Sequence, residues 1–331
     1  MTAKWTYLLA ALILGLIFPG QNLWAAEQLK VLAHVGPWPV IDRLIGYGGK
    51  LWFSNSVKGR NHNSADIWSY DPSSGNVRYE RYLHSQDAGG PLIYRDLLYW
   101  PFEDSRFSLG WGMIEVTNGK DWAPLLVPTA EIFHLHHLTE MNGDLLAVSS
   151  AWRAGYQRSR DGGKTWSRAY DHMTPKGRVS RFTDTVSVGG KVYSRLRARG
   201  LTMLTVWTGD GPVREVSGWP QGSPVSALLA HKNTAYAVTR QKKTSSVWRL
   251  SGEGANRLTP PEEAWRVMDM TSDGQSLWAV TRAGDQSKVW QSKDDGETWS
   301  VAYEFSGGFP WSIHVLDGQV YVGGRGPDGI G

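Results

Sequence analysis

The sequence predicts an all-β fold, a seven-bladed β-propeller, from three observations. A short motif recurs at a nearly constant interval, glycine-rich turns recur in phase with it, and no helical periodicity persists after residue 26. The motif is a turn followed by an apolar or aromatic strand, as in GGKLWFS, NGDLLAVS and DGQVYVG. Its members align on Trp52, Leu98, Leu146, Tyr193, Tyr236, Trp278 and Tyr321. Successive members lie 42 to 48 residues apart, which suits four short strands and their turns.

The sixth repeat shows what one blade contains. Its four strand candidates are WRVMDMT, SLWAVTR, KVWQSKD and WSVAYEF. One four-stranded sheet cannot cover both of its apolar faces, whereas radial stacking buries them against neighbouring sheets. We expect the 18 Trp and 13 Tyr to fill the wedges between blades. The alternative is that these rings form a platform on which sugars stack.

The first 26 residues predict a signal peptide. They contain one lysine, an apolar stretch over residues 8–18, the helix breakers Pro19 and Gly20, and the small residues Ala25 and Ala26. The apolar stretch is about half of the roughly 20 residues that a membrane span needs. An uncleaved anchor is the alternative. Residues 27–331 are then a single propeller domain without a membrane span, exported to the periplasm or the cell exterior.

The two ends of the domain predict how the ring closes. The strand QLKVLAHV, residues 28–35, precedes the first repeat and belongs to no blade of its own. We expect it to join the last blade as its outer strand. A third strand of the last blade is not evident, so either RGPDGIG forms a rudimentary strand or the sequence is shortened at this end.

Composition excludes several classes of protein. The 35 basic and 31 acidic residues are interspersed, and the formal net charge of +4 comes with no long basic run. A nucleic-acid partner is therefore not expected. The chain has no cysteine, which excludes cysteine-ligated zinc, iron–sulfur clusters and a cysteine nucleophile. We expect no cofactor.

Two turns carry a recognisable motif. They read SRDGGKTW from Ser159 to Trp166 and SKDDGETW from Ser292 to Trp299, and both match S-x-D-x-G-x-T-W, the Asp-box. On these residues the sequence resembles the Asp-box (BNR-repeat) propellers, which include sialidases, photosystem II assembly factors and many uncharacterised exported proteins. The predicted structural residues of the two boxes are Ser159, Asp161, Gly163, Trp166, Ser292, Asp294, Gly296 and Trp299.

The box residues have a mechanical interpretation. A carboxylate can accept backbone N–H bonds inside the tight turn, glycine provides a positive φ, and tryptophan plugs the hairpin into the blade. The resemblance implies that these boxes lie on the blade periphery and are structural. We therefore do not interpret Asp161 and Asp294 as a catalytic pair.

A ligand site is expected at the mouth of the central channel, where the inner strands converge. Aligning these strands on the repeat brings together polar residues that a packed wedge does not require. The candidate ligand-binding residues are Asp42, Arg43, His136, His137, Asp184, Asp269 and His314. They form either a ring that binds a small polar ligand or a metal, or a network in which the side chains satisfy one another around a wet channel.

The segment FHLHHL offers a metal-site hypothesis. Strand alternation puts His134 and His136 on one face, roughly 6.5 to 7 Å apart. Imidazole suits zinc, copper or nickel, and Asp184 or His314 are candidates for a third ligand. No H-E-x-x-H or cysteine spacing supports such a site. We therefore expect no metal and assign no catalytic residue.

Two functions remain. The first is an exported binding or assembly module for a protein or glycan partner. The second is a glycan-acting hydrolase or lyase, which the sialidase resemblance suggests. The sialidase catalytic set is not matched, because Arg43 lacks the Ile-Pro that would follow it and no Tyr–Glu pair aligns. Sialidase catalytic domains also have six blades. We expect a binding module and not an enzyme.

Overall fold

The computed structural model describes residues 27–28, 30–57, 62–105, 112–128, 134–151, 153–173, 179–198, 200–241, 243–263 and 265–326. The predicted signal peptide and the tail after Gly326 lie outside these ranges. All elements of regular secondary structure in the described ranges are β-strands. No helix there is both long and apolar enough to cross a membrane.

Hydrogen bonding divides the strands of the described residues into six sheets. One four-stranded sheet holds β2 (Val40–Tyr47), β3 (Lys50–Ser56), β4 (Asp66–Asp71) and β5 (Asn76–Tyr82). A second holds β6 (Leu92–Tyr94), β7 (Leu97–Pro101), β8 (Gly112–Thr117) and β9 (Trp122–Val127). An eight-stranded sheet holds β10 (His134–Met141), β11 (Asp144–Ala151), β12 (Arg153–Ser159), β13 (Ser167–Met173), β14 (Ser180–Val188), β15 (Lys191–Ala198), β16 (Leu201–Trp207) and β17 (Arg214–Glu215).

The remaining sheets differ in size. A third four-stranded sheet holds β18 (Val225–His231), β19 (Thr234–Gln241), β20 (Thr244–Ser251) and β21 (Gly254–Leu258). A five-stranded sheet holds β22 (Arg266–Ser272), β23 (Leu277–Ala283), β24 (Gln286–Ser292), β25 (Ser300–Ser306) and β1 (Glu27–Gln28). The last sheet has two strands, β26 (Phe309–Leu316) and β27 (Gln319–Arg325).

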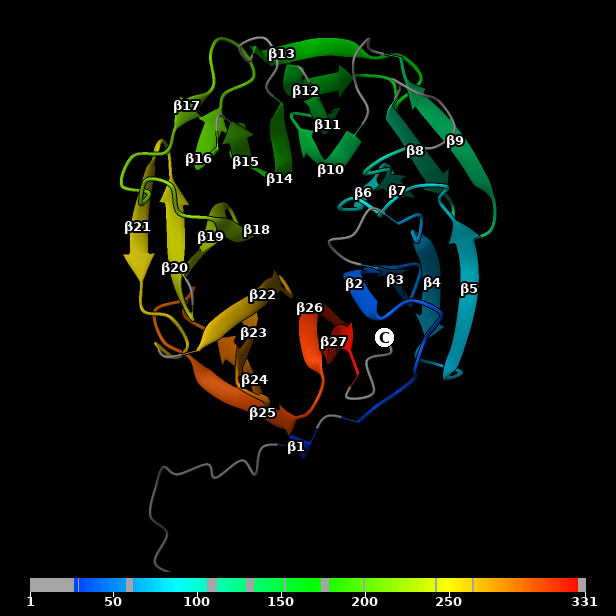
Figure 1. The fold of residues 1–331 in the computed structure, drawn as a ribbon, viewed down its shortest axis with the longest axis vertical. Coiled ribbons are helices and arrows are strands. Elements are labelled where there is room, and N and C mark those ends of the chain that lie inside the picture. The colour runs from blue at the N-terminus through cyan, green and yellow to red at the C-terminus, as the bar shows by residue number, and fades with distance from the viewer. Residues whose placement is uncertain are drawn as a thin grey trace, which may run out of the picture.

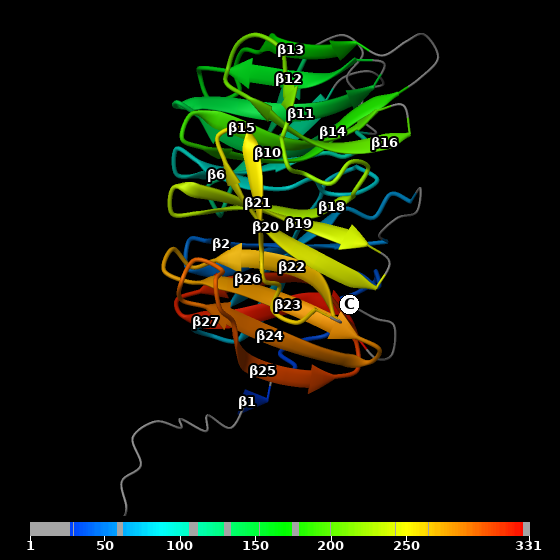
Figure 2. The same ribbon diagram turned by 90° about the vertical axis from the view of Figure 1, so that its left-hand side faces the viewer.

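The sheets stand in a ring around a central axis, as Figure 1 shows and Figure 2 repeats from the side. Within each group the chain starts at the inner strand and moves outward through antiparallel neighbours. The prediction of an all-β, propeller-like fold is confirmed. That the ring has seven blades remains a prediction. The reason is that β11 pairs with β14, which joins two groups of strands into one sheet.

The aromatic repeat marks the second strand of each group. The seven residues on which the repeat aligns lie on β3, β7, β11, β15, β19, β23 and β27. Six of them are buried, and Tyr321 on β27 is half-buried. They pack between sheets: Tyr236 on β19, for example, joins one core cluster with Val267 and Leu277 of the next sheet. Apolar contact between sheets is therefore what holds the ring.

Ring closure differs from the prediction. The N-terminal strand does not extend the last sheet, since β1 pairs in parallel with β25 of the sheet before it. The following segment instead packs Ala33 and Val35 on Leu51 and Phe53 of the first sheet. This cluster also includes Tyr321 of the last sheet. Apolar side chains packed between the first and last sheets therefore close the ring here.

The first Asp-box turn is held by its own side chains. The Asp161 carboxylate accepts the Ser159 hydroxyl at 2.8 Å and the Thr165 N–H at 2.9 Å. Gly163 has a φ of 93°, and its N–H donates to the Ser159 hydroxyl at 2.7 Å. The Trp166 indole donates to the Gly163 carbonyl at 2.9 Å. The turn joins β12 to β13, away from the inner strands, as the structural interpretation expects.

The second box, between β24 and β25, repeats these contacts. Asp294 accepts the Ser292 hydroxyl at 2.8 Å and the Thr298 N–H at 2.9 Å, and Gly296 has a φ of 92°. In both boxes the threonine hydroxyl and N–H donate to the carboxylate and lower the pKa of the aspartate to about 2. In contrast to Trp166, Trp299 has a buried indole N–H without a hydrogen bond to the described residues.

Candidate functional site

Six inner strands carry a β-bulge at a similar place in their sheets, whereas the inner strand β6 pairs with β7 without a register shift. The register shifts at Asp42/Ile45 in β2, Leu135/His137 in β10, Phe182/Thr185 in β14, Val225/Ala227 in β18, Val267/Asp269 in β22 and Pro310/Ser312 in β26. A bulge interrupts the alternation of side chains and redirects those beside it. In β2 it places Arg43 at a φ of 57°, a region that non-glycine residues seldom adopt. The repeated bulge therefore sets what faces the channel.

A cavity of about 420 Å³ lies between the inner strands. Five of the seven predicted ligand-binding residues line it, namely Asp42, Arg43, His137, Asp184 and Asp269. His136 and His314 do not line it. Two further lining residues, Arg195 and Arg240, were not anticipated. They lie on the second strands β15 and β19, whereas the sequence alignment considered inner strands only.

Asp184 pairs with two arginines of the cavity. It lies 2.7 Å from the Arg195 guanidinium and 4.0 Å from that of Arg43. Burial alone would raise the pKa of Asp184, but Arg195 and Arg43 outweigh it and lower the pKa to about 2. Arg195 also donates to the carbonyl of Val225 at 2.7 Å. Asp184 and Arg195 thus satisfy each other, as the network hypothesis expects.

Arg43 is less fully engaged. Its Nε is buried and has no hydrogen-bond partner among the described residues. Burial opposes its charge, but nearby carboxylates, led by Asp42 and Asp184, raise the pKa of Arg43. A guanidinium that stays charged while one of its N–H groups is unsatisfied retains the capacity to bind an acceptor.

Two titratable groups of the cavity are neutral or partly neutral near pH 7. Burial, followed by the charge of Arg43, lowers the pKa of His137 to about 4. The His137 ring lies against Gly90, where a Cβ atom would stand 1.9 Å from it. Burial raises the pKa of Asp269 to about 7, although its carboxylate accepts the Ile313 N–H at 3.1 Å. At pH 7 the His137 ring is therefore neutral, and the Asp269 carboxyl is about half protonated.

The other histidines make packing contacts outside the cavity. The buried His136 ring hydrogen-bonds the Ser150 hydroxyl at 2.9 Å and stacks on His134 with ring centroids 5.6 Å apart. Burial, then His134, lowers the pKa of His136 well below its usual value. His314 accepts the Gly46 N–H at 2.9 Å, at the contact between the first and last inner strands. Among the residues that the structure describes, no three acidic, histidine or cysteine side chains form a metal cluster.

A row of arginines follows the aromatic repeat. In four consecutive repeats the residue four positions after the aligned tyrosine or tryptophan is an arginine: Arg197, Arg240, Arg282 and Arg325. Each lies in the second strand of its group, at or near the carboxyl end. This column was present in the sequence and was missed, because the aromatic position was used only to find strands.

Arg240 connects this row to the cavity. Its side chain is exposed and makes no ion pair with a described residue. Burial, then the charges of Arg266 and Arg195, lowers the pKa of Arg240. Like charges that crowd one another are relieved by an anion, so this side of the cavity favours a negatively charged ligand.

The fold and the cavity together define an all-β protein of propeller-like arrangement with a polar central site. No family model and no curated protein matches the sequence. Solved structures do. YCF48 from Cyanidioschyzon merolae matches with a TM-score of 0.60 and 11% identity over 88% of this chain and 94% of that one. An ulvan lyase bound to -[GlcA(1-4)Rha3S]- matches with a TM-score of 0.55 and 12% identity over 91% and 96%.

A third neighbour is larger than this chain. A xyloglucanase from Xanthomonas campestris matches with a TM-score of 0.58 and 13% identity over 91% of this chain and 54% of that one. At such identities the likeness shows the fold alone. The sequence-based resemblance to the Asp-box family is accordingly supported at the level of the propeller-like fold.

Proposed function

We propose that this chain is an exported, non-catalytic binding or assembly module that holds an anionic group of a protein or glycan partner at the mouth of its central channel. The proposal rests on one observation. Arg240 lines the cavity near other arginines, and it has no acidic partner in the described residues. The carboxylate or sulfate of a partner would supply the missing counter-charge.

The architecture part of this proposal is a propeller of seven blades. It counts the eight-stranded sheet as two blades and the two-stranded sheet as the seventh. Two facts support this count: the aromatic repeat occurs seven times, and β11 and β14 share only the pairs Ser150↔Arg181 and Ala151↔Ser180. Residues 1–26 are proposed to direct export.

The charges of the cavity favour an anion over a cation. The cavity carries three guanidinium groups, of Arg43, Arg195 and Arg240. Asp42 is the leading carboxylate that supports the charge of Arg43. Asp184 is occupied by Arg195, and Asp269 with its pKa of about 7 is only partly charged at neutral pH. Arg240 and the unsatisfied Nε of Arg43 remain to contact a ligand. One neighbour in fold, the ulvan lyase, is described with a bound carbohydrate that contains glucuronate and sulfated rhamnose, which shows that a propeller-like protein can take such a ligand.

A binding titration tests this function. A chondroitin sulfate hexasaccharide is expected to bind the mature protein, and neutral dextran is not. Arg240→Gln should weaken binding about tenfold, which is the loss of one charge-assisted hydrogen bond. Arg257→Gln, on the outer strand β21, is the matched control and should leave binding unchanged. Equal losses in both variants, or no binding at low salt, would reject the channel as the site.

A glycan-acting lyase or hydrolase is the second candidate. It is favoured by Asp269, which lines the cavity and whose pKa of about 7 suits proton transfer at neutral pH. Turnover of uronate-containing or sulfated glycans that is lost in Asp269→Asn but kept in Asp161→Asn would establish it. Binding without turnover would leave the module as the function.

A further inference from the structure

The last sheet ends at its second strand, β27, whereas the other groups of strands continue to a third or fourth strand in the described residues. It contains two strands, and within the described residues β27 pairs with β26 alone. A sheet edge presents a row of backbone N–H and C=O groups that can pair with another extended chain. This edge lies where the ring closes and where the predicted N-terminal strand was expected but does not pair.

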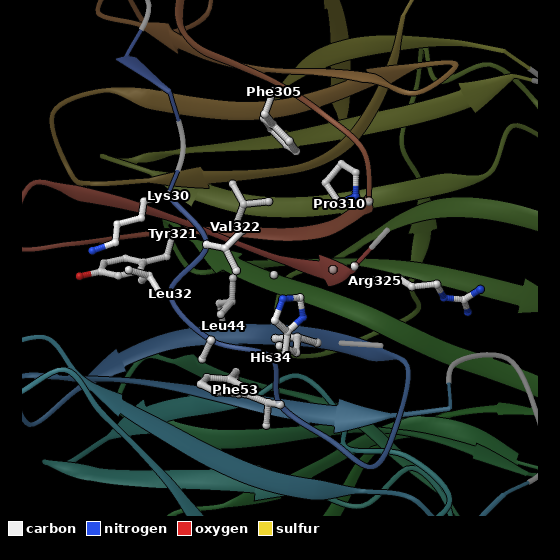
Figure 3. A pocket seen from close by; sticks show the side chains of 18 of the residues that line it. Lys30, Leu32, His34, Leu44, Phe53, Phe305, Pro310, Tyr321, Val322 and Arg325 are labelled. Carbon is white, nitrogen blue, oxygen red and sulfur yellow. The ribbon is translucent and has the colours of Figure 1, made fainter. Parts of the chain in front are cut away.

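A groove of about 300 Å³ runs along this edge. Figure 3 shows its walls: Val322 and Tyr321 from β27, Phe53 from β3, and Leu32 from the segment before β2. Leu32 is 50% exposed even though it borders an apolar surface. The groove therefore combines an edge for backbone pairing with apolar walls for side chains.

The charged side chains of the described residues at the groove are all basic. Figure 3 shows Lys30 at one end and Arg325 at the other, with His34 between them. Lys30 and Arg325 are exposed, and neither makes an ion pair with a described residue. Among the described residues, no acidic side chain lines the groove. A ligand that is apolar in its middle and acidic at its ends would match both features.

We propose that this groove binds an extended segment of a partner protein, which adds to β27 as a new strand. The segment has alternating apolar residues and an acidic residue near each end, and it is about as long as the seven residues of β27. Backbone pairing supplies affinity, while the apolar walls and the two cations select the sequence. This site is separate from the channel and does not depend on the function proposed for it.

The first test is peptide binding measured by fluorescence anisotropy. The probe is a labelled peptide of alternating valine and threonine with a glutamate at each end. Lys30→Glu and Leu32→Ser should each weaken its binding about tenfold, and a peptide with lysine ends should bind more weakly than the glutamate form. Leu201→Ser is the matched control, because Leu201 is also 50% exposed but lies on β16. It should leave binding unchanged, as should Arg240→Gln.

Hydrogen exchange separates strand addition from simple adhesion. Saturating peptide should slow exchange of backbone amides within Gln319–Arg325, with no change in the Asp-box turn at 159–166. The proposal is overturned if the peptide does not saturate, if β27 amides are unaffected, or if Arg240→Gln abolishes binding. Self-association of the protein that Leu32→Ser disrupts would also overturn it, since the occupant would then be a second copy.

Discussion

The cavity in the central channel and the groove beside β27, where the ring closes, are similar in size and opposite in chemistry. The channel cavity of about 420 Å³ is lined by Asp42, Asp184 and three arginines, whereas the groove of about 300 Å³ is lined by Phe53, Val322 and other apolar residues. The first arises from side chains that β-bulges redirect. The second arises because two sheets meet through an irregular segment instead of a shared strand.

The difference separates what holds the ring from what the ring can bind. Apolar contacts supply most of the stability at every junction between sheets, including the closing one. The charged groups of the channel satisfy one another only in part, so they supply binding capacity at some cost in stability. Mutations in the two regions should therefore have distinct consequences.

The largest effect is expected at the closing junction. Phe53 is 4% exposed and joins the cluster that contacts both the first and the last sheet. Phe53→Ala should lower the free energy of unfolding by about 4 kcal/mol, as burial is lost and a cavity is left. Urea denaturation measures this, with Phe53→Leu as the control at about 1 kcal/mol. A loss below about 1 kcal/mol for alanine would show that the apolar cluster does not close the ring.

A somewhat smaller effect is expected in the channel. Asp184→Ala removes the carboxylate that Arg195 and Arg43 share and should cost about 3 kcal/mol, because two guanidinium groups lose their nearest counter-charge. Asp184→Asn, which keeps a hydrogen-bond acceptor, should lose less. If alanine is tolerated without loss, the pair is solvated and the channel is more open than its lining indicates.

A pH dependence sharpens the contrast. The pKa of Asp269 is raised to about 7, so the folded protein retains a proton that the unfolded chain releases near pH 4. Its contribution to stability is fully present below about pH 4 and is lost as the pH rises to about 7. Asp269→Asn should flatten the profile of unfolding free energy in that window. An unchanged profile would place the titration elsewhere.

The Asp-box turns predict the opposite sign. Asp161 has its pKa lowered to about 2, so its contribution is present above about pH 4 and is lost as the pH falls through about 2. Asp161→Asn should lower the melting temperature slightly above about pH 4 and still less near pH 2, because the contribution is lost there and the turn is exposed. Thermal unfolding at pH 2 to 5 checks this, and a large loss at pH 7 would contradict the assignment of the turn to a local role.

The sequence was informative where structure repeats. Trp52 and the six residues aligned with it mark second strands in all repeats, because packing between sheets demands a large apolar side chain there. Five channel residues were found because inner strands share a register. Arg195 and Arg240 were missed because they lie on second strands, which the alignment of inner strands left out. His136 and His314 do not line the cavity, because the bulges in β10 and β26 shift side chains in ways that a two-residue alternation cannot show.

Ring closure could not be predicted from a strand pattern. The segment around Val35 has the alternation of a strand, but Ala33 and Val35 pack in one cluster with side chains of the first and last sheets, and the segment does not pair with β27. Such a choice depends on the distance between the first and last sheets, which the local sequence does not encode.

The central claim is that the channel and the groove are independent binding sites. Simultaneous binding of two probes tests this claim most directly. The labelled peptide with glutamate ends is titrated into protein saturated with the chondroitin sulfate hexasaccharide. We predict that the peptide dissociation constant stays within about twofold of its value without the hexasaccharide, because each probe has its own site. Competition that raises it about tenfold or more would contradict the account and place both anions on one surface.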